Sequence, residues 1–227
     1  MSPATVNSEV THLPKIINIL CFGDSLTEGF TSTKVPDHPY ATSLQAVLAK
    51  RLASHVVSVQ VQGLGGDKVT GNFLMRMKAL CESACSVDFA VILGGTNDLI
   101  SNQQTRDIWP VLKNVWEIPL ACSSTVLALT IPECGLATPQ VNAEREALNS
   151  LIRNHHSENF HVFDLSEAMP YWEIPTDQRR LLWADTIHFS EKGYDLVGAM
   201  IADQLASIIE ALPNSTEIKE DYEKVEL

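Results

Sequence analysis

The chain has 227 residues, of which 45% are hydrophobic, and this length and composition suit a single globular domain with a full core. Its formal net charge of -12 disfavours negatively charged partners such as nucleic acids and anionic membrane surfaces. We therefore expect a small neutral molecule as its ligand or substrate, and no strong membrane binding.

The two ends of the sequence are polar and frame one domain. Residues 1–14 lack the basic start of an export signal, and the apolar run that follows them is short. Five cysteines, an odd number without the spacing of a disulfide framework, are typical of reduced thiols. Both observations predict a cytoplasmic location. Residues 213–227 form an acidic tail that we expect to be solvated, so the domain is predicted to span residues 15–212.

Apolar, β-branched runs alternate with segments of helical periodicity along the chain. The apolar runs predict strands at residues 15–22, 56–62, 88–93, 124–131 and 160–164. The periodic segments predict helices at residues 40–52, 69–81, 105–118, 140–155 and 191–212. This alternation predicts an α/β fold built from right-handed βαβ units. The expected architecture is a three-layer α/β/α sandwich around a five-stranded parallel sheet.

Three glycine-containing motifs follow the first three predicted strands. They are Gly23-Asp24-Ser25-Leu26-Thr27, Gly63-Leu64-Gly65-Gly66-Asp67 and Gly94-Gly95-Thr96-Asn97-Asp98. Ligands of open α/β sheets bind at the carboxyl ends of the strands, so the three motifs are expected to share one site. A fourth motif, Asp185-Thr186-Ile187-His188, precedes the last predicted helix, where a loop can return to the same edge.

These four motifs contain the groups that nucleophilic catalysis needs. A serine hydroxyl is a poor nucleophile at neutral pH, so it requires an imidazole to take its proton and a carboxylate to orient that imidazole. Asp185 and His188 are close enough in sequence for one loop to deliver both, whereas Ser25 must arrive by folding. A tetrahedral oxyanion also needs N–H donors, which bare backbone at Gly66 and the amide of Asn97 can provide.

Each motif taken alone has a plainer interpretation. Gly, Asp and Ser are common in turns and at helix N-caps, so the first and third motifs could be ordinary strand-to-helix turns. The Asp185 motif could be a surface loop or half of a metal site. A metal site would need several converging ligands, and the remaining histidines show no ligand pattern. Four such segments at suitable loop positions favour the nucleophilic site, with no metal and no cofactor.

The order serine, glycine, asparagine and histidine resembles the SGNH (GDSL) hydrolase family over nearly all of the chain. The resemblance implies a flavodoxin-like fold and an ester hydrolase in which Ser25 is the nucleophile. His188 is then the general base and later the general acid, oriented by Asp185. The implied oxyanion hole combines the N–H groups of Ser25 and Gly66 with the side chain of Asn97.

The substrate pocket is less well defined by the sequence. Phe30, Leu99, Ile100 and Ile131 follow predicted strands and are candidate walls by position alone, and Trp183 belongs to an apolar segment directly before Asp185. Such an apolar cluster could equally be core packing. Because no long additional lid is evident, we expect a modest pocket for short or medium acyl groups.

Three functions are therefore considered. The first is hydrolysis of carboxylic esters, including acetyl esters, through an acyl-enzyme on Ser25. The second is an acyltransferase that passes the same acyl group to an alcohol instead of water. The third is a non-catalytic binding module, which has no need of an assembled triad and is therefore the weakest.

Overall fold

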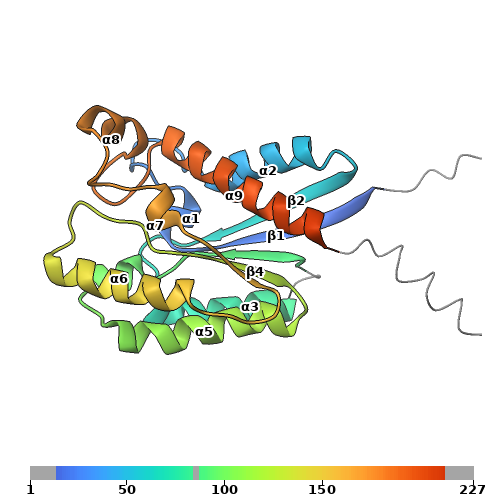
Figure 1. The fold of residues 1–227 in the computed structure, drawn as a ribbon, viewed down its shortest axis with the longest axis horizontal. Helices are drawn as coiled ribbons and strands as arrows, with labels where there is room; N and C mark the ends of the chain where they lie inside the picture. The colour runs from blue at the N-terminus through green and yellow to red at the C-terminus, as the bar shows by residue number, and fades with distance from the viewer. Residues whose placement is uncertain (1–13, 84–86, 213–227) are drawn as a thin grey trace, which may run out of the picture.

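The computed structural model describes residues 14–83 and 87–212 (Figure 1). Five parallel strands form one sheet in the order β2-β1-β3-β4-β5. These strands are β1 (Lys15–Gly23), β2 (His55–Gly63), β3 (Phe89–Ile92), β4 (Thr125–Leu129) and β5 (Phe160–Phe163). The predicted five-stranded parallel sheet is confirmed. Residues 1–13 of the polar N-terminal segment and the acidic tail at 213–227 lie outside the described residues.

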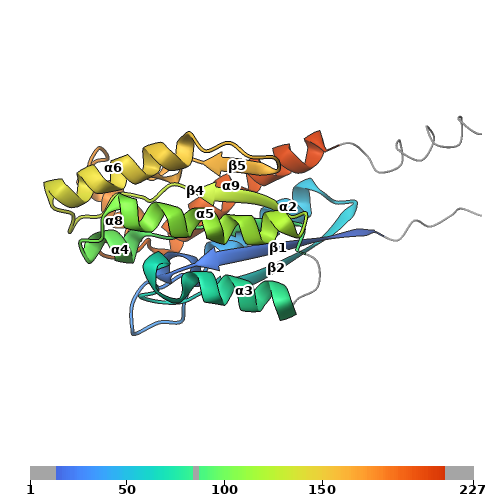
Figure 2. The same ribbon diagram turned by 90° about the horizontal axis from the view of Figure 1, so that it is seen from below.

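Helices cover both faces of the sheet, so the predicted three-layer sandwich is also confirmed. One face carries α2 (Tyr40–Arg51) and α9 (Glu191–Ala211), and the other carries α3 (Leu74–Ser83), α5 (Thr105–Ala121) and α6 (Pro139–Arg153). Figure 2, seen from below, shows α3, α5 and α6 side by side across their face.

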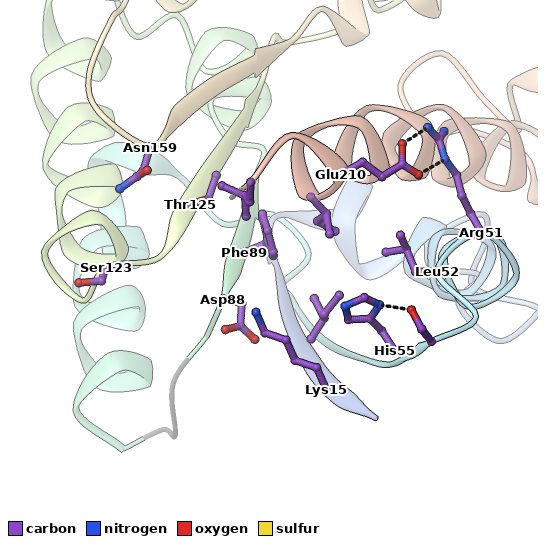
Figure 3. A pocket seen from close by; sticks show the side chains of 14 residues that line it. Lys15, Arg51, Leu52, His55, Asp88, Phe89, Ser123, Thr125, Asn159 and Glu210 are labelled. Atoms are coloured by element: carbon purple, nitrogen blue, oxygen red, sulfur yellow. Dashed lines mark hydrogen bonds and ion pairs between the residues drawn. The ribbon is translucent and has the colours of Figure 1, made fainter. Parts of the chain in front are cut away.

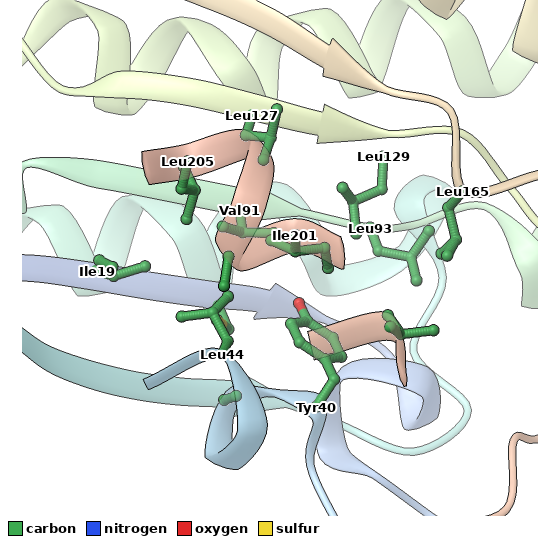
Figure 4. Packing of buried hydrophobic residues seen from close by; sticks show 14 of the residues in the cluster. Ile19, Tyr40, Leu44, Val91, Leu93, Leu127, Leu129, Leu165, Ile201 and Leu205 are labelled. Atoms are coloured by element: carbon green, nitrogen blue, oxygen red, sulfur yellow. The ribbon is translucent and has the colours of Figure 1, made fainter. Parts of the chain in front are cut away.

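The interior strand β1 shows how the sheet contacts both helical layers. Successive strand residues point to opposite faces, so Ile19 and Cys21 pack under α2 and α9, whereas Leu20 and Phe22 pack against α3 and α5. Figure 4 shows the first of these two clusters, between the sheet and α9. Because both faces are covered, the strand reads as a nearly continuous apolar run.

Short helical segments were not among the predicted elements. They are α1 (Ser25–Glu28), α4 (Thr96–Ile100), α7 (Leu165–Ala168) and α8 (Thr176–Leu182). Each spans two turns or fewer, which is too short for a helical period to stand out in sequence. The helix expected over residues 69–81 is a kinked turn at Val69–Phe73 followed by α3, because Gly71 departs from helical geometry.

The loops that follow β1, β2, β3 and β4 all leave the carboxyl edge of the sheet, as parallel strands require. The first three predicted motifs therefore lie on one edge. None of the helices within 14–83 and 87–212 is long and apolar enough to cross a membrane.

Candidate active site

Ser25 begins α1, a single helical turn directly after β1. Asp24 caps this turn, because its Oδ1 accepts the N–H of Leu26 at 2.9 Å. Gly29 ends the turn at a φ of 89°, a left-handed conformation that favours glycine. The Ser25 residue is 8% exposed. Its hydroxyl is thus fixed at the carboxyl end of β1 by a turn that is capped at both ends.

Asp185 and His188 lie on a tight loop whose ends are paired. Trp183 and Phe189 form an antiparallel bridge, and the N–H of Ala184 donates to the carbonyl of His188 at 2.9 Å. Inside the loop, Oδ1 of Asp185 accepts the N–H groups of Ile187 and His188, each at 2.6 Å. The carboxylate therefore organises the loop that carries its own histidine.

The carboxylate of Asp185 also binds the imidazole, with Oδ2 2.8 Å from Nδ1 of His188. Partial burial opposes ionisation of Asp185, but the N–H groups of His188 and Ile187 and the imidazole outweigh burial and hold its pKa below the usual range. Asp185 is therefore ionised and accepts the Nδ1 proton, which leaves Nε2 of the neutral ring as an acceptor.

The free ring nitrogen faces the serine. Nε2 of His188 lies 2.9 Å from Oγ of Ser25, although the two residues are separated by 163 positions in sequence. The ring of Phe30 packs edge-on against the imidazole with centroids 4.8 Å apart. Tyr194 fixes the backbone of Phe30 through a 2.8 Å hydrogen bond from its hydroxyl to the Phe30 carbonyl. The structure thus brings Ser25, His188 and Asp185 into one hydrogen-bonded chain.

The three glycines at the end of β2 and in the loop after it are needed for different structural reasons. A Cβ at Gly63 would lie 2.0 Å from the backbone nitrogen of Glu28, and one at Gly65 would lie 2.9 Å from Oε2 of Glu28. Gly66 has open space around it but adopts a φ of 74°. Gly63 and Gly65 therefore permit close packing against α1, whereas Gly66 provides a left-handed turn in an exposed segment.

Asn97 lies in the first turn of α4 and points back toward the first two motifs. Its Nδ2 donates to the carbonyl of Asp67 at 3.0 Å and lies 3.4 Å from Oδ2 of Asp24. The neighbouring Asp98 is fully buried and accepts the N–H groups of Val69 and Thr70 at 2.8 and 2.9 Å. Asp98 thereby ties α4 to the segment after β2 and keeps the side chain of Asn97 at the edge.

Arg76 on α3 stabilises the same edge, and no sequence pattern pointed to it. Its guanidinium binds the carboxylate of Asp67 and donates to the carbonyls of Gly23 and Gln62 at 3.2 and 2.7 Å. These contacts join the ends of β1 and β2 to the loop that carries Gly66. Asp67 is an acidic residue that could pair with a cation, but the sequence does not indicate which one.

A second brace holds the histidine loop. The N–H of Gly135 donates to the carbonyl of Thr186 at 2.6 Å, and Tyr171 packs over Gly135 and against Trp183. Glu133 accepts the N–H of Tyr171 at 2.8 Å. The apolar segment before Asp185 is a candidate pocket wall by its sequence, but Tyr171 and Trp183 within it support the loop after β4 and the loop that carries His188.

The proposed pocket walls divide into two groups. Leu99, Ile131 and Trp183 are only 2%, 0% and 4% exposed and pack in the two core clusters, so they offer little surface to a substrate. The positions of Leu99 and Ile131 after strands correctly predicted that they lie near the edge. The sequence did not show that their side chains turn into the core. Phe30 and Ile100 are half-buried and keep some surface at this edge.

A cavity of about 620 Å³ lies at the opposite, amino edge of the sheet (Figure 3). Its lining includes Lys15, Arg51, His55, Asp88 and Glu210. None of the residues singled out by the four motifs belongs to it. In the described part of the chain, no three His, Cys, Asp or Glu side chains are grouped so that they could hold a metal ion.

Comparisons with known proteins agree with this geometry. The GDSL-like lipase/acylhydrolase family model matches residues 21–196. Among solved structures, a lipase/acylhydrolase from Enterococcus faecalis shares 25% identity with a TM-score of 0.63, over 84% of this chain and 96% of that one. A lipolytic protein of the G-D-S-L family from Veillonella parvula shares 21% identity with a TM-score of 0.63, over 83% and 97%. The inhibitor-bound aryl esterase of M. smegmatis shares 20% identity with a TM-score of 0.62, over 84% and 99%. No curated protein gives a significant match.

Proposed function

Because the chain belongs to the GDSL-like lipase/acylhydrolase family of ester hydrolases, we propose that it hydrolyses small neutral carboxylic esters through an acyl-enzyme on Ser25. The observation that carries this proposal is the hydrogen-bonded chain from Ser25 Oγ through His188 to Asp185, at 2.9 and 2.8 Å. A hydroxyl, an imidazole and a carboxylate in that order are what activation of a serine requires.

In the first half of the reaction, Ser25 Oγ attacks the ester carbonyl carbon while its proton passes to Nε2 of His188. The carbonyl oxygen becomes an oxyanion, which accepts hydrogen bonds from the N–H groups of Ser25 and Gly66 and from Nδ2 of Asn97. Collapse of this intermediate breaks the bond to the alkoxy oxygen, and His188 returns the proton to the departing alcohol. The acyl group is then esterified to Ser25.

The second half repeats these steps with water. His188 takes a proton from a water molecule as its oxygen attacks the acyl carbon, and the oxyanion again forms at the same donors. Collapse releases the carboxylic acid, and His188 returns the proton to Ser25 Oγ. Asp185 stays ionised throughout and stabilises the imidazolium that forms in each half.

The substrate that we propose follows from charge and from the exposed surface of the edge. A net charge of -12 favours a neutral ester over an anionic one. Of the five predicted wall residues, Phe30 and Ile100 alone keep appreciable surface, and Phe30 touches the imidazole. Short or medium acyl groups, including acetyl, suit so small an apolar contact. We also propose a cytoplasmic location, from the odd number of cysteines and their spacing.

A substrate panel combined with active-site labelling tests the proposal. Hydrolysis is measured on p-nitrophenyl esters of increasing acyl length and on acetylated sugars, with and without an added alcohol and with and without EDTA. We expect the highest rates on short or medium chains, no effect of EDTA, and labelling of Ser25 by a fluorophosphonate.

Each of the other outcomes points to a different function. Transfer of the acyl group to the added alcohol in preference to water would make the chain an acyltransferase. Loss of activity with EDTA and recovery with zinc or manganese would make Asp185 and His188 metal ligands. An absence of both turnover and labelling would leave a binding module.

A further inference from the structure

Asp24 directly precedes the nucleophile, and its carboxylate does more than cap a helix. The residue is 1% exposed. Its Oδ1 accepts the N–H of Leu26, while Oδ2 faces Nδ2 of Asn97 at 3.4 Å. Arg76, the cation that reaches this part of the edge, binds the carboxylate of Asp67 and the carbonyl of Gly23. The second oxygen of Asp24 is therefore directed at the amide of Asn97.

The amide of Asn97 can be placed in two ways that differ by a half-turn of its end group. One way turns its NH2 toward the edge, and the other turns its carbonyl oxygen there. Only the NH2 can donate to an oxyanion, since the carbonyl oxygen would repel it. The activity of Asn97 therefore depends on which of the two orientations the surroundings select.

Two acceptors select the NH2 orientation. The carbonyl of Asp67 accepts a hydrogen bond from Nδ2 of Asn97 at 3.0 Å, and Oδ2 of Asp24 lies 3.4 Å from the same nitrogen. If the amide turned over, its carbonyl oxygen would face both of these acceptors in a partly buried setting, which is unfavourable. The longer contact with Asp24 is also the weaker one, so a substrate oxygen can compete for that hydrogen as it gains charge.

We propose that Asp24 is a positioning residue for the oxyanion hole, acting through Asn97 by keeping its NH2 turned toward the reacting carbonyl. This inference rests on the proposed serine mechanism. The two oxygens of one carboxylate then have separate roles. Oδ1 fixes the turn that carries Ser25, and Oδ2 orients the amide of Asn97 as a donor for the oxyanion.

Two variants separate these tasks. Asp24→Ser keeps an N-cap oxygen for Leu26 but is too short to reach Asn97. Asp24→Asn keeps the cap with its amide oxygen and turns its own NH2 toward that of Asn97. We expect each variant to lower kcat by about 10- to 100-fold, below the full loss expected for an oxyanion donor. KM is expected to stay within about twofold, since the contact matters most as charge develops.

A double-mutant cycle with Asn97→Ala shows whether Asp24 acts through that residue. In the Asn97→Ala background, Asp24→Ser is expected to cause little further loss of kcat. Thr138→Ala is the matched control, because Thr138 caps α6 by accepting the N–H of Val141 at 3.2 Å. It is expected to lower the melting temperature as a lost cap does and to leave kcat unchanged.

Wild-type kcat in Asp24→Ser would overturn the proposal, as would losses that simply multiply in the double variant. Fluorophosphonate labelling of Ser25 in the wild type is measured first. Failure of that labelling counts against the serine mechanism itself, whereas labelling together with multiplying losses counts against the role of Asp24 alone.

Discussion

The two edges of the sheet differ in cavity volume and in the arrangement of their polar groups. The amino edge has the cavity of about 620 Å³, but its charged groups are largely engaged with protein partners: Arg51 binds Glu210 at 2.9 Å and Asp203 at 3.3 Å. The carboxyl edge has the directed chain of Ser25, His188 and Asp185. Cavity volume is therefore a poor guide to chemistry in this molecule, and the direction of hydrogen bonds is a better one.

The strongest test of this contrast is a pair of substitutions, one at each edge. Ser25→Ala is expected to lower the rate of ester hydrolysis by roughly 10⁴- to 10⁶-fold while the protein stays folded, because it removes the nucleophilic oxygen. His55→Gln alters the amino-edge cavity, where His55 bonds to the neighbouring Ser54, and is expected to leave the rate unchanged. Steady-state kinetics and circular dichroism measure both.

The reverse pattern would move the site to the other edge. Retention of more than about a tenth of wild-type turnover by Ser25→Ala, against that expected range, would remove this residue from the mechanism. A comparable loss in His55→Gln would bring the amino-edge cavity into the reaction.

Asp185→Asn is expected to have the next largest effect, about 10⁴-fold in kcat. If the amide oxygen keeps the N–H groups of Ile187 and His188, the NH2 faces Nδ1 and forces the ring proton onto Nε2. That nitrogen can then no longer accept the proton of Ser25. Asp195→Asn is the matched control, since Asp195 also binds a histidine, His38, at 2.9 Å but lies outside the site. Equal losses in the two variants would argue for a general effect of charge.

Asn97→Ala is expected to lower kcat by roughly 10²- to 10³-fold with a smaller change in KM, because the lost hydrogen bond strengthens as the oxyanion forms. Asn154→Ala removes an exposed amide whose Nδ2 donates to the carbonyl of Ser150, far from the four motifs in sequence, and serves as the control. An unchanged kcat in Asn97→Ala would assign the oxyanion to backbone donors alone.

The last prediction concerns stability rather than the rate of the reaction. Burial raises the pKa of Asp24 to about 7 from 3.8, with the N–H of Leu26 opposing the shift and the carboxylates of Asp98 and Asp67 adding to it. The folded carboxyl therefore stays neutral over a range of pH in which the unfolded one has ionised, and its proposed contact with Asn97 belongs to the ionised form that predominates above about pH 7. The free energy of unfolding should therefore fall as pH rises from about 4 to about 7, by up to roughly 4 kcal/mol.

Asp24→Asn removes that titration, so urea unfolding midpoints at about pH 4.5 and about pH 8 should differ less in the variant than in the wild type. Any cost of the new amide against Asn97 is a constant offset and does not change with pH. An identical pH dependence in both proteins would mean that Asp24 is already ionised across this range in the folded state.

The sheet and the positions of the motifs were easier to predict from the sequence than the directions of individual side chains. The sheet followed from apolar runs such as 15–22, because a strand covered on both faces must be apolar throughout. The positions of the first three motifs followed from the rule that parallel strands end at one edge. Side-chain direction did not follow: Leu99 and Ile131 come after strands, yet they turn into the core, since the order of residues does not fix the rotation of a short helix or loop.

The residues that support the site through side-chain contacts could not be predicted either. Arg76 is braced against Asp67 from a helix of its own, and Glu133 supports Tyr171 across 38 residues of sequence. Neither pair shows a spacing that a pattern could reveal, because each contact exists only after the layers have packed. The sequence could therefore indicate candidates for the reacting residues, but not the residues that hold them in place.

The 163-residue separation of Ser25 from His188 bears on biosynthesis. Synthesis proceeds from the N-terminus, so the turn that carries Ser25 is made before the loop that carries His188. A nascent chain that has released only β1 to β4 carries the hydroxyl without the imidazole. Under the proposed mechanism, ester hydrolysis therefore requires the chain to have been made and folded at least as far as His188, so turnover would report assembly of the sheet together with that loop.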